Sequence, residues 1–230
     1  MNSGPILFLC AFLTMAASFW GLILKPYAQL ATEDLRQVGV SKRLYPNNTL
    51  GLAKAGADVY RAHGCVECHT QQVRPEGQGG DIARGWGIRR TVAQDYLLEQ
   101  PVQLGSLRVG PDLANVGARL PDAQWHYQHM YAPRSKVPES TMPAYKFLFR
   151  KQPITGAGSP DALQFEDDFA PEEGFEIVPT EAARALVAYL TSRRADLALF
   201  EAPVPASPDA EGDTNAAPAQ AESITTPAAE

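Results

Sequence analysis

Two cysteines and a histidine make up the run with the clearest chemical meaning in this sequence, Cys65-Val66-Glu67-Cys68-His69. In this spacing each thiol can add to one vinyl group of a porphyrin, and the adjacent imidazole falls under the iron as an axial ligand. A redox dithiol or half of a zinc site would use the same cysteines, but a zinc site needs a second ligand pair. The remaining cysteine, Cys10, lies far upstream in an apolar run. The motif therefore predicts one covalently bound haem c, attached at Cys65 and Cys68, with His69 as an iron ligand.

A haem iron that carries electrons usually has a second axial ligand, and four downstream side chains are candidates. Met142 precedes Pro143, and this proline favours an extended loop that can present a thioether to the iron. Met130, His126 and His129 fall in an expected helix, where packing or surface roles are the commoner ones. We predict Met142 as the second ligand and keep the other three as alternatives. A Met/His pair raises the potential relative to a bis-His pair, which suits a carrier near the oxidising end of a chain.

An uncharged apolar stretch runs from Pro5 to Leu24. Twenty helical residues rise about 30 Å, which is enough to cross the hydrocarbon core of a bilayer. A cleaved signal peptide is the alternative, but no Lys or Arg precedes the run, which is also long for a signal sequence. We predict a retained anchor over residues 1–27 and a connector over residues 28–50.

Charge is spread unevenly along the chain. Residues 42–151 hold 15 basic and nine acidic side chains, a net charge of +6, whereas residues 152–230 hold three and 15, a net charge of −12. Haem propionates need Arg, Trp, Tyr or backbone donors where they are buried, so part of the basic charge fits a haem domain. A nucleic-acid partner is not expected, because no binding motif accompanies the basic residues.

Periodicity and capping residues predict a mostly α-helical domain over residues 51–200. The first expected helix runs from Leu50 to about His63, with apolar positions at Leu52, Ala55, Val59 and Ala62. Two shorter helices are expected across residues 92–99 and 122–131. The last helix begins at the capping residue Thr180, and its apolar stripe consists of Ala183, Leu186, Val187 and Leu190. Gly64 ends the first helix directly before the haem motif. Residues 70–90 are expected to form a loop, residues 152–179 a Gly/Pro/acid-rich insertion, and residues 201–230 a disordered Ala/Pro/acidic tail.

Several elements in this order resemble a class I cytochrome c domain: Gly56 and Tyr60 before the motif, the run Gly110-Pro111-Asp112-Leu113 after it, Met142-Pro143, and the final LVAYL helix. The resemblance implies that the carbonyl of Pro111 accepts a hydrogen bond from the second ring nitrogen of His69, which fixes the imidazole tautomer. It also implies that Arg119, in the run VGAR, interacts with a haem propionate.

A narrower resemblance covers most of residues 56–149. GCVECHTQQVRP, GSLRVGPDLANVGARL and WHYQHMYAPRSKVPESTMPAYKFL resemble the mono-haem, membrane-anchored subunit II of cbb3-type cytochrome c oxidases, with the motifs in the same order. The resemblance implies a bacterial inner-membrane subunit with its haem domain on the periplasmic side. It implies an electron donor that is another c-type cytochrome, and an acceptor that is the haem b of the catalytic haem–copper subunit. Residues 79–90 depart from the family pattern, and no metal ligand is carried over there.

Three functions remain to be compared. A non-catalytic electron relay fits best, because a single membrane helix without histidine cannot supply the ligands of an oxygen-reducing centre. No residue of this chain is therefore assigned a catalytic role. A tethered carrier for another complex, such as a nitric oxide reductase or a quinol-oxidising assembly, is the second possibility. The third is a gas-sensing haem module, which would need an open sixth position on the iron. The insertion and the acidic tail can alter docking with a donor or simply form solvated surface.

Overall fold

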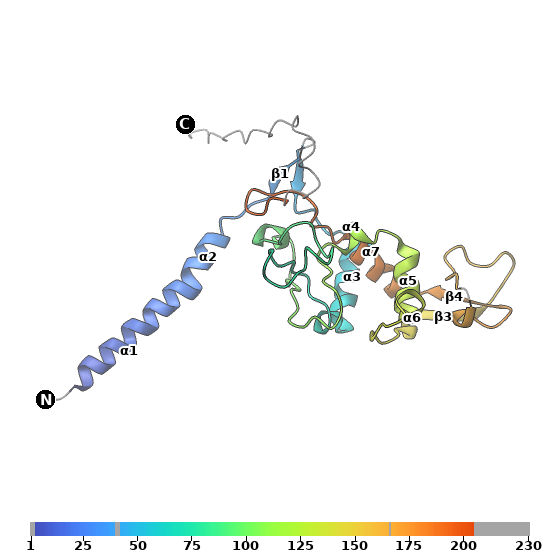
Figure 1. Cartoon of the computed structure of the whole chain (residues 1–230), viewed down its shortest axis with the longest axis horizontal. Helices are drawn as coiled ribbons and strands as arrows, with labels where there is room; N and C mark the ends of the chain where they lie inside the picture. Colours follow the sequence, from blue (N-terminus) through green and yellow to red (C-terminus); the bar gives the residue numbers. More distant parts are fainter. Residues whose placement is uncertain (1–2, 40–41, 166, 205–230) are drawn as a thin grey trace.

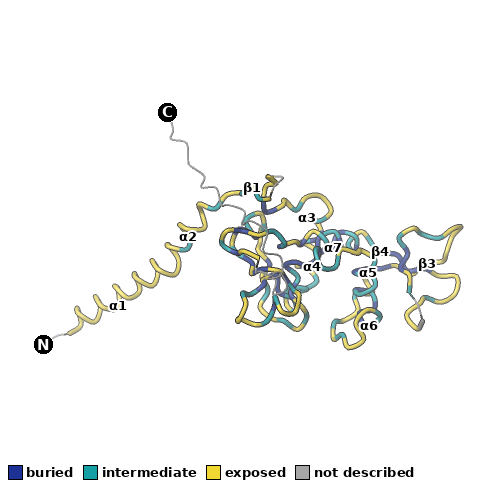
Figure 2. The backbone as a smooth tube through the Cα atoms, turned by 45° about the horizontal axis from the view of Figure 1, so that its top comes forward, coloured by how far each residue is buried: buried dark blue, intermediate teal, exposed yellow. Residues whose placement is uncertain are grey.

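The computed structural model describes residues 3–39, 42–165 and 167–204, and shows one long N-terminal helix standing away from a helix-rich domain (Figure 1). The domain contains α3 (Gly51–Ala62), α4 (Val116–Arg119), α5 (Ala123–Tyr131), α6 (Pro133–Lys136) and α7 (Glu181–Ser192). Two antiparallel pairs of strands accompany them, β1 (Arg36–Val38) with β2 (Arg43–Tyr45) and β3 (Phe149–Pro153) with β4 (Phe175–Pro179). The core surrounds α7, which packs against α3, α4, α5 and β4, and Figure 2 shows buried segments in α7 and in the chain around it.

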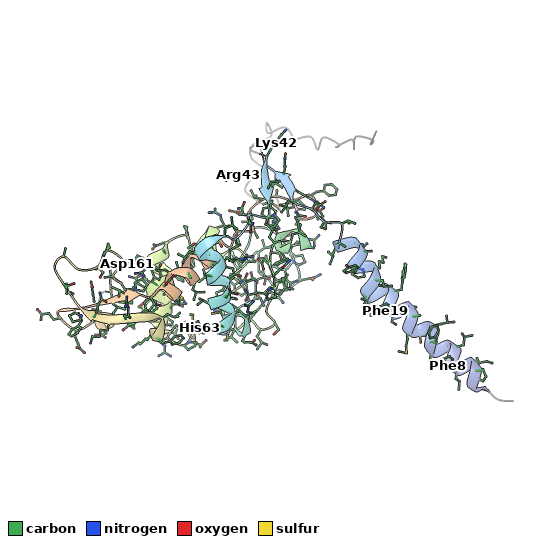
Figure 3. The ribbon with its side chains drawn as sticks, turned by 180° about the vertical axis from the view of Figure 1, so that it is seen from behind. Phe8, Phe19, Lys42, Arg43, His63 and Asp161 are labelled. Atoms are coloured by element: carbon green, nitrogen blue, oxygen red, sulfur yellow. The ribbon has the colours of Figure 1, made fainter. Side chains whose placement is uncertain are left out.

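The N-terminal helix is continuous from Gly4 to Leu30 and is the one helix in the described chain that is long and apolar enough to cross a membrane. It comprises α1 (Gly4–Phe19), a π-helical turn and α2 (Lys25–Leu30). Phe8 and Phe19 stand out from its surface, far from the folded domain (Figure 3). The helix outlasts the predicted anchor by three residues because it accommodates Pro26 instead of ending there. Pro26 has no N–H and cannot donate the usual helical hydrogen bond to the carbonyl four residues earlier. The wider π-helical turn Trp20–Leu24, just before it, accommodates the missing bond without ending the helix.

Helices α3 and α7 cross at a point where only glycine fits. A Cβ atom on Gly56 would lie 1.9 Å from the backbone oxygen of Ala185, so the two backbones are in direct contact. The rings of Tyr60 and Tyr189 pack beside the crossing with their centroids 5.4 Å apart. Of the apolar positions that predicted α3, Val59 is half-buried and the others are exposed, Leu52 at 46%, whereas Gly56 and Tyr60 form the buried face. The helix is confirmed, but its packing depends on a glycine and a tyrosine that the apolar pattern does not include.

A methyl group at position 56 should therefore destabilise the domain. We expect Gly56→Ala to lower the free energy of unfolding by on the order of 3 kcal/mol, because backbone atoms of α7 cannot move aside as a side chain would. Ala55→Leu is the matched control on the same helix, since Ala55 is exposed, and it should change stability by less than about 0.5 kcal/mol. Urea titrations of the purified chain followed by circular dichroism measure both values. Equal stability of Gly56→Ala and the wild type would contradict this packing.

Side chains cap the starts of two predicted helices, and the cap of α7, Thr180, is the one that the sequence predicted. Asp122 accepts hydrogen bonds from the backbone of Gln124 and Trp125 at the start of α5. Thr180 accepts one from Ala183 at the start of α7, and the predicted apolar stripe of α7 is buried. Across 92–99 the chain forms only a short 3-10 turn, Ala93–Tyr96. The segment before Pro101 is only about two helical turns long, which is too short for a regular α-helix to be stable there.

The segment 152–179 is not only solvated surface. Its two ends pair as β3 and β4 in the register Phe149↔Pro179 to Pro153↔Phe175. Ile177 and Leu163 belong to the hydrophobic core, and the backbone of Leu163 donates to that of Ile177 over 2.8 Å. The sequence pattern does not indicate these strands, because an acidic loop separates them and prolines stand at their ends.

A buried ion pair attaches the β1–β2 hairpin to the domain. The guanidinium of Arg89, fully buried, donates to both carboxylate oxygens of Asp95 over 3.0 and 2.8 Å. The Tyr45 hydroxyl at the end of β2 donates to the same carboxylate. The connector that follows the membrane helix is thus held against the loop that precedes the short 3-10 turn.

The chain after α7 returns to this hairpin. Arg89 also donates to the backbone oxygen of Leu197, and Glu201 forms an ion pair with Arg36 in β1. Ala202 is buried, so the first residues of the predicted tail pack against the domain. Residues 205–230, the rest of that tail, lie outside the described residues.

Candidate functional site

The haem-attachment motif begins where α3 ends. Gly64 adopts a left-handed conformation at φ +67°, and a 3-10 turn, Cys65–Glu67, follows it. The backbone N–H of His69 donates to the oxygen of Cys65 over 3.0 Å, which places both thiols and the imidazole on one short turn. His63, labelled in Figure 3, marks the end of α3 directly before this turn. Both cysteines are free thiols, as covalent attachment of a porphyrin requires.

A cavity of about 430 Å³ opens beside the two thiols. Segments far apart in the sequence supply its walls: the motif, the loop 109–113, α4 and α5, the loop 137–145 and the buried face of α7. The cavity collects every residue that sequence analysis singled out for the haem site, Cys65, Cys68, His69, Pro111, Arg119 and Met142. It is mostly apolar with a few polar groups, which is the usual composition of a cofactor site.

On one wall, His69 is held by the loop that carries Pro111. Its Nδ1 atom lies 2.8 Å from the carbonyl oxygen of Pro111, the contact that sequence analysis expected. Gly110 allows the loop to come this close, since a Cβ atom there would lie 2.3 Å from Cε1 of the imidazole. Burial lowers the pKa of His69, although the Pro111 carbonyl opposes the shift. The imidazole is therefore neutral at neutral pH, with Nε2 available as a ligand.

Met142 contributes to the cavity wall from the loop between α6 and the short turn at Lys146. Its backbone N–H donates to Oγ of Ser140 over 3.3 Å, and its side chain is half-buried against the core. Three residues later, the N–H of Tyr145 donates to the carbonyl of Met130 over 2.8 Å, which ties this loop to α5. The loop is thus tied to α5 just after Met142, and Met142 lines the cavity.

The three alternative ligands also line the cavity, but each has a structural role. Met130 is 4% exposed and belongs to the hydrophobic core. Nε2 of His126 lies 2.8 Å from the carbonyl oxygen of Leu120, a contact that ties α5 to the end of α4. His129 stacks on Trp125 with ring centroids 4.8 Å apart. Burial lowers the pKa of both histidines, so their charge state does not distinguish them from His69.

Arg119, at the end of α4, lines the cavity with one unsatisfied donor. One of its terminal nitrogens donates to the backbone oxygen of Asp112 over 2.8 Å, whereas the buried Nε has no partner among the described residues. Burial lowers the pKa of this guanidinium. A buried N–H without an acceptor is costly, so this wall is suited to an anionic group within the cavity.

Two buried aspartates beside the motif were not singled out by sequence analysis. Asp112 accepts hydrogen bonds from Thr70 and from the backbone of Gln72. Asp81, also fully buried, accepts from Arg74 and is paired with Arg108. Asp81 and Arg74 belong to the 70–90 region expected to be a loop, and charged pairs hold that loop in place. A run of charged residues in a Gly-rich segment gives no signal of which pairs will be buried.

Asp81 should make the stability of the domain depend on pH in the acid range. Burial alone would raise its pKa, but hydrogen bonds from Arg108 and Arg74 lower it from 3.8 to about 2. The folded state therefore binds this proton less tightly than the unfolded state. The stabilisation is present above about pH 4 and is lost as the pH falls through about 2, by about 2 kcal/mol in all.

Urea titrations between pH 5 and pH 2 test this expectation. Asp81→Asn should be less stable than the wild type at pH 5 and should lose less stability on acidification. Asp58→Asn is the control, because Asp58 is an exposed residue of α3, and its pH profile should follow that of the wild type. If Asp81→Asn and the wild type lose stability in parallel on acidification, the ion pairs of Asp81 with Arg74 and Arg108 do not cause this pH dependence.

A model of the family described as "Cytochrome C oxidase, mono-heme subunit/FixO" matches residues 5–164 of the 230. The chain belongs to this family. It is thus a mono-haem cytochrome subunit of a cbb3-type oxidase, which functions in electron transfer and partners the catalytic subunit of the oxidase. The match includes the apolar N-terminal helix, the thiol motif and the loop of Met142. No curated protein matches the chain.

The residues around the cavity fit the single haem of a mono-haem subunit. Gly110 leaves the imidazole of His69 uncovered, Arg119 offers an unsatisfied donor for a propionate, and two free thiols stand at the rim. The apolar lining, from α7 and the loop 109–113, suits the porphyrin faces. The donor set is therefore compatible with a haem held by thiols, an imidazole and a thioether.

Proposed function

We propose that this subunit carries one haem c in the cavity, and that it relays electrons from a c-type cytochrome donor to the haem b of the catalytic subunit. The observation that carries the proposal is the convergence of Cys65, Cys68, His69 and Met142 on one cavity from two distant segments. The haem supplies reversible one-electron chemistry when bound. The chain supplies attachment, axial ligands and a docking surface, and oxygen is reduced in the partner subunit.

Cys65 and Cys68 are the proposed attachment points. They would hold the haem through thioether bonds, for which each thiol would add its sulfur and its hydrogen across one vinyl double bond, so no oxidant would be needed. Burial raises the pKa of Cys65 to about 11, so this sulfur is a thiol at neutral pH. The short turn from Cys65 to His69 then keeps the imidazole beside the attachment points.

His69 and Met142 are the residues that would bind the haem iron. The Pro111 carbonyl fixes His69 as the Nδ1–H tautomer, which leaves the lone pair of Nε2 free for iron. Met142 is favoured over Met130 because its side chain is only half-buried at the edge of the core, whereas Met130 is buried within it. Arg119 is proposed to hold a propionate through its unsatisfied Nε.

The cavity rim provides a docking surface for a redox partner. Val109 and Val137 line the cavity and are 64% and 41% exposed. On the helix and loop beside Met142, the exposed basic residues Arg134, Lys136 and Lys146 outnumber the exposed acidic residue Glu139. An apolar centre with basic neighbours favours a partner whose docking face is acidic. The membrane helix would keep this surface near the partner, with the domain on the periplasmic side of the inner membrane.

A class I cytochrome c fold for the domain is part of the same proposal. Support comes from the close α3–α7 crossing at Gly56, the Pro111 contact with His69, and the methionine loop that closes the cavity. The strands β3 and β4 extend this domain by adding Leu163 and Ile177 to its core.

Affinity purification of the tagged chain from membranes tests the proposed function. We expect the reduced-minus-oxidised spectrum to contain both c-type and b-type haem bands, with oxygen uptake in the same fraction. A fraction with c-type haem alone, from membranes that do consume oxygen, would contradict the relay and favour a tethered carrier for another complex.

A further inference from the structure

Asp112 joins the segment after His69 to the segment that carries Pro111. Its Oδ2 atom accepts hydrogen bonds from the Thr70 hydroxyl over 2.6 Å and from the backbone N–H of Gln72 over 2.7 Å. Its Oδ1 atom accepts from the N–H of Ala114 over 2.9 Å. The carboxylate is fully buried, so water does not share these bonds.

Backbone hydrogen bonds complete the same connection. The N–H of Gly110 donates to the oxygen of Cys68 over 3.0 Å, and that of Leu113 donates to Thr70 over 2.8 Å. Segments 68–72 and 110–114 are thus joined by hydrogen bonds on both sides of the contact between His69 and Pro111. Among these contacts, the Asp112 carboxylate is the side chain that accepts hydrogen bonds from both segments.

We propose that Asp112, together with Thr70, is a positioning residue that sets the hydrogen bond between His69 and Pro111. This inference rests on the proposed role of His69 as an iron ligand. Asp112 follows Pro111 directly and Thr70 follows His69 directly, so their 2.6 Å bond fixes the distance between the two backbones that carry the imidazole and its acceptor. When the Pro111 carbonyl is held firmly, its hydrogen bond makes the imidazole a stronger electron-pair donor to iron, which stabilises the ferric state of the haem.

Two arginines hold the carboxylate and its backbone in place. Arg108 lies 3.8 Å from Oδ2 of Asp112, and Arg119 donates to the backbone oxygen of the same residue. A buried carboxylate needs such partners, because an unpaired buried charge is strongly destabilising. Asparagine is isosteric but cannot replace the carboxylate, since its NH2 group would face one or more of the three donors that Asp112 accepts.

The simplest alternative is that Asp112 only stabilises the loop. Loop stability and imidazole positioning predict different results for the same variants. Thr70→Val removes the hydroxyl while keeping its shape, and Thr70→Ser keeps the hydroxyl. Thr180→Val is the matched control, because the Thr180 hydroxyl also joins two segments, donating to Leu148 over 2.7 Å at the start of α7, away from the cavity.

The test uses the purified oxidase complex, with the c-haem band followed in redox titrations and the ferric c-haem followed by electron paramagnetic resonance. Thr70→Val and Asp112→Asn should raise the midpoint potential of the c-haem and shift its largest g value. Thr70→Ser should resemble the wild type. Thr180→Val should lower the melting temperature and leave both signals unchanged.

Two results separate this inference from the proposed function. If Thr70→Val lowers only the melting temperature, as Thr180→Val does, Asp112 and Thr70 are structural and the positioning role is overturned. If the wild-type complex lacks a low-spin ferric c-haem signal, the proposed axial ligation itself fails, whatever the variants show. Should Asp112→Asn prevent assembly, the milder Thr70→Val carries the test alone.

Discussion

Replacement of Met142 by alanine should abolish the weak charge-transfer band at the red edge of the oxidised spectrum, because that band requires sulfur on the iron. The ferrous haem should then bind carbon monoxide rapidly and completely, since the sixth position would be open. The midpoint potential should fall, by on the order of 0.1 V within the span of about 0.8 V that axial ligands cover. Optical spectra and a redox titration of the purified complex measure all three effects.

Met130→Leu is the matched control for this prediction. Met130 lines the same cavity but is buried in the core, so leucine should fill its volume and the band should remain. Retention of the band in Met142→Ala, with its loss in Met130→Leu, would transfer the ligand role to Met130. Absence of the band from the wild-type complex would exclude a thioether at either position and direct attention to His126 and His129.

Replacement of both Cys65 and Cys68 by serine should eliminate covalently bound haem. On a denaturing gel stained for haem peroxidase activity, the wild-type chain should stain and the double variant should not, because serine hydroxyls do not form the thioether bonds. Either single variant retains one thiol, so weak staining is expected there. The subunit should also fail to support oxygen uptake by the complex.

Cys10→Ser is the control for the attachment sites. Cys10 is exposed on the membrane helix, far from the cavity in the described structure, so its replacement should leave haem staining unchanged. Haem staining in the double variant at the wild-type level would contradict covalent attachment at the motif.

The main helices of the domain were predictable because their signals are local. Asp122 and Thr180 carry capping side chains, and the stripe of α7 recurs with helical period, so both helices follow from neighbouring residues. The thiol motif is equally local. The Pro111 contact with His69 spans 42 positions, yet it was expected from the resemblance to a family.

The charged pairs and strands that surround the site could not be predicted in the same way. Arg89 is fully buried against Asp95, whereas arginine is usually exposed, and nothing near it in the sequence marks this exception. Asp112 lies 42 positions from its partner Thr70, and β3 pairs with β4 across a long acidic loop. Such contacts depend on how the chain folds back on itself, which local patterns do not encode.

Rapid mixing of the oxidised complex with a reduced c-type cytochrome tests the central claim most directly, with the c-haem and b-haem bands followed separately. The proposed relay predicts that the c-haem band of this subunit reduces first and the b-haem band follows. Met142→Ala should slow the first step, because the lower potential of its haem makes it a weaker electron acceptor, and the b-haem should therefore be reduced later than in the wild type. Reduction of the b-haem at the wild-type rate in Met142→Ala, or in a complex whose subunit lacks haem, would show that electrons do not pass through this chain.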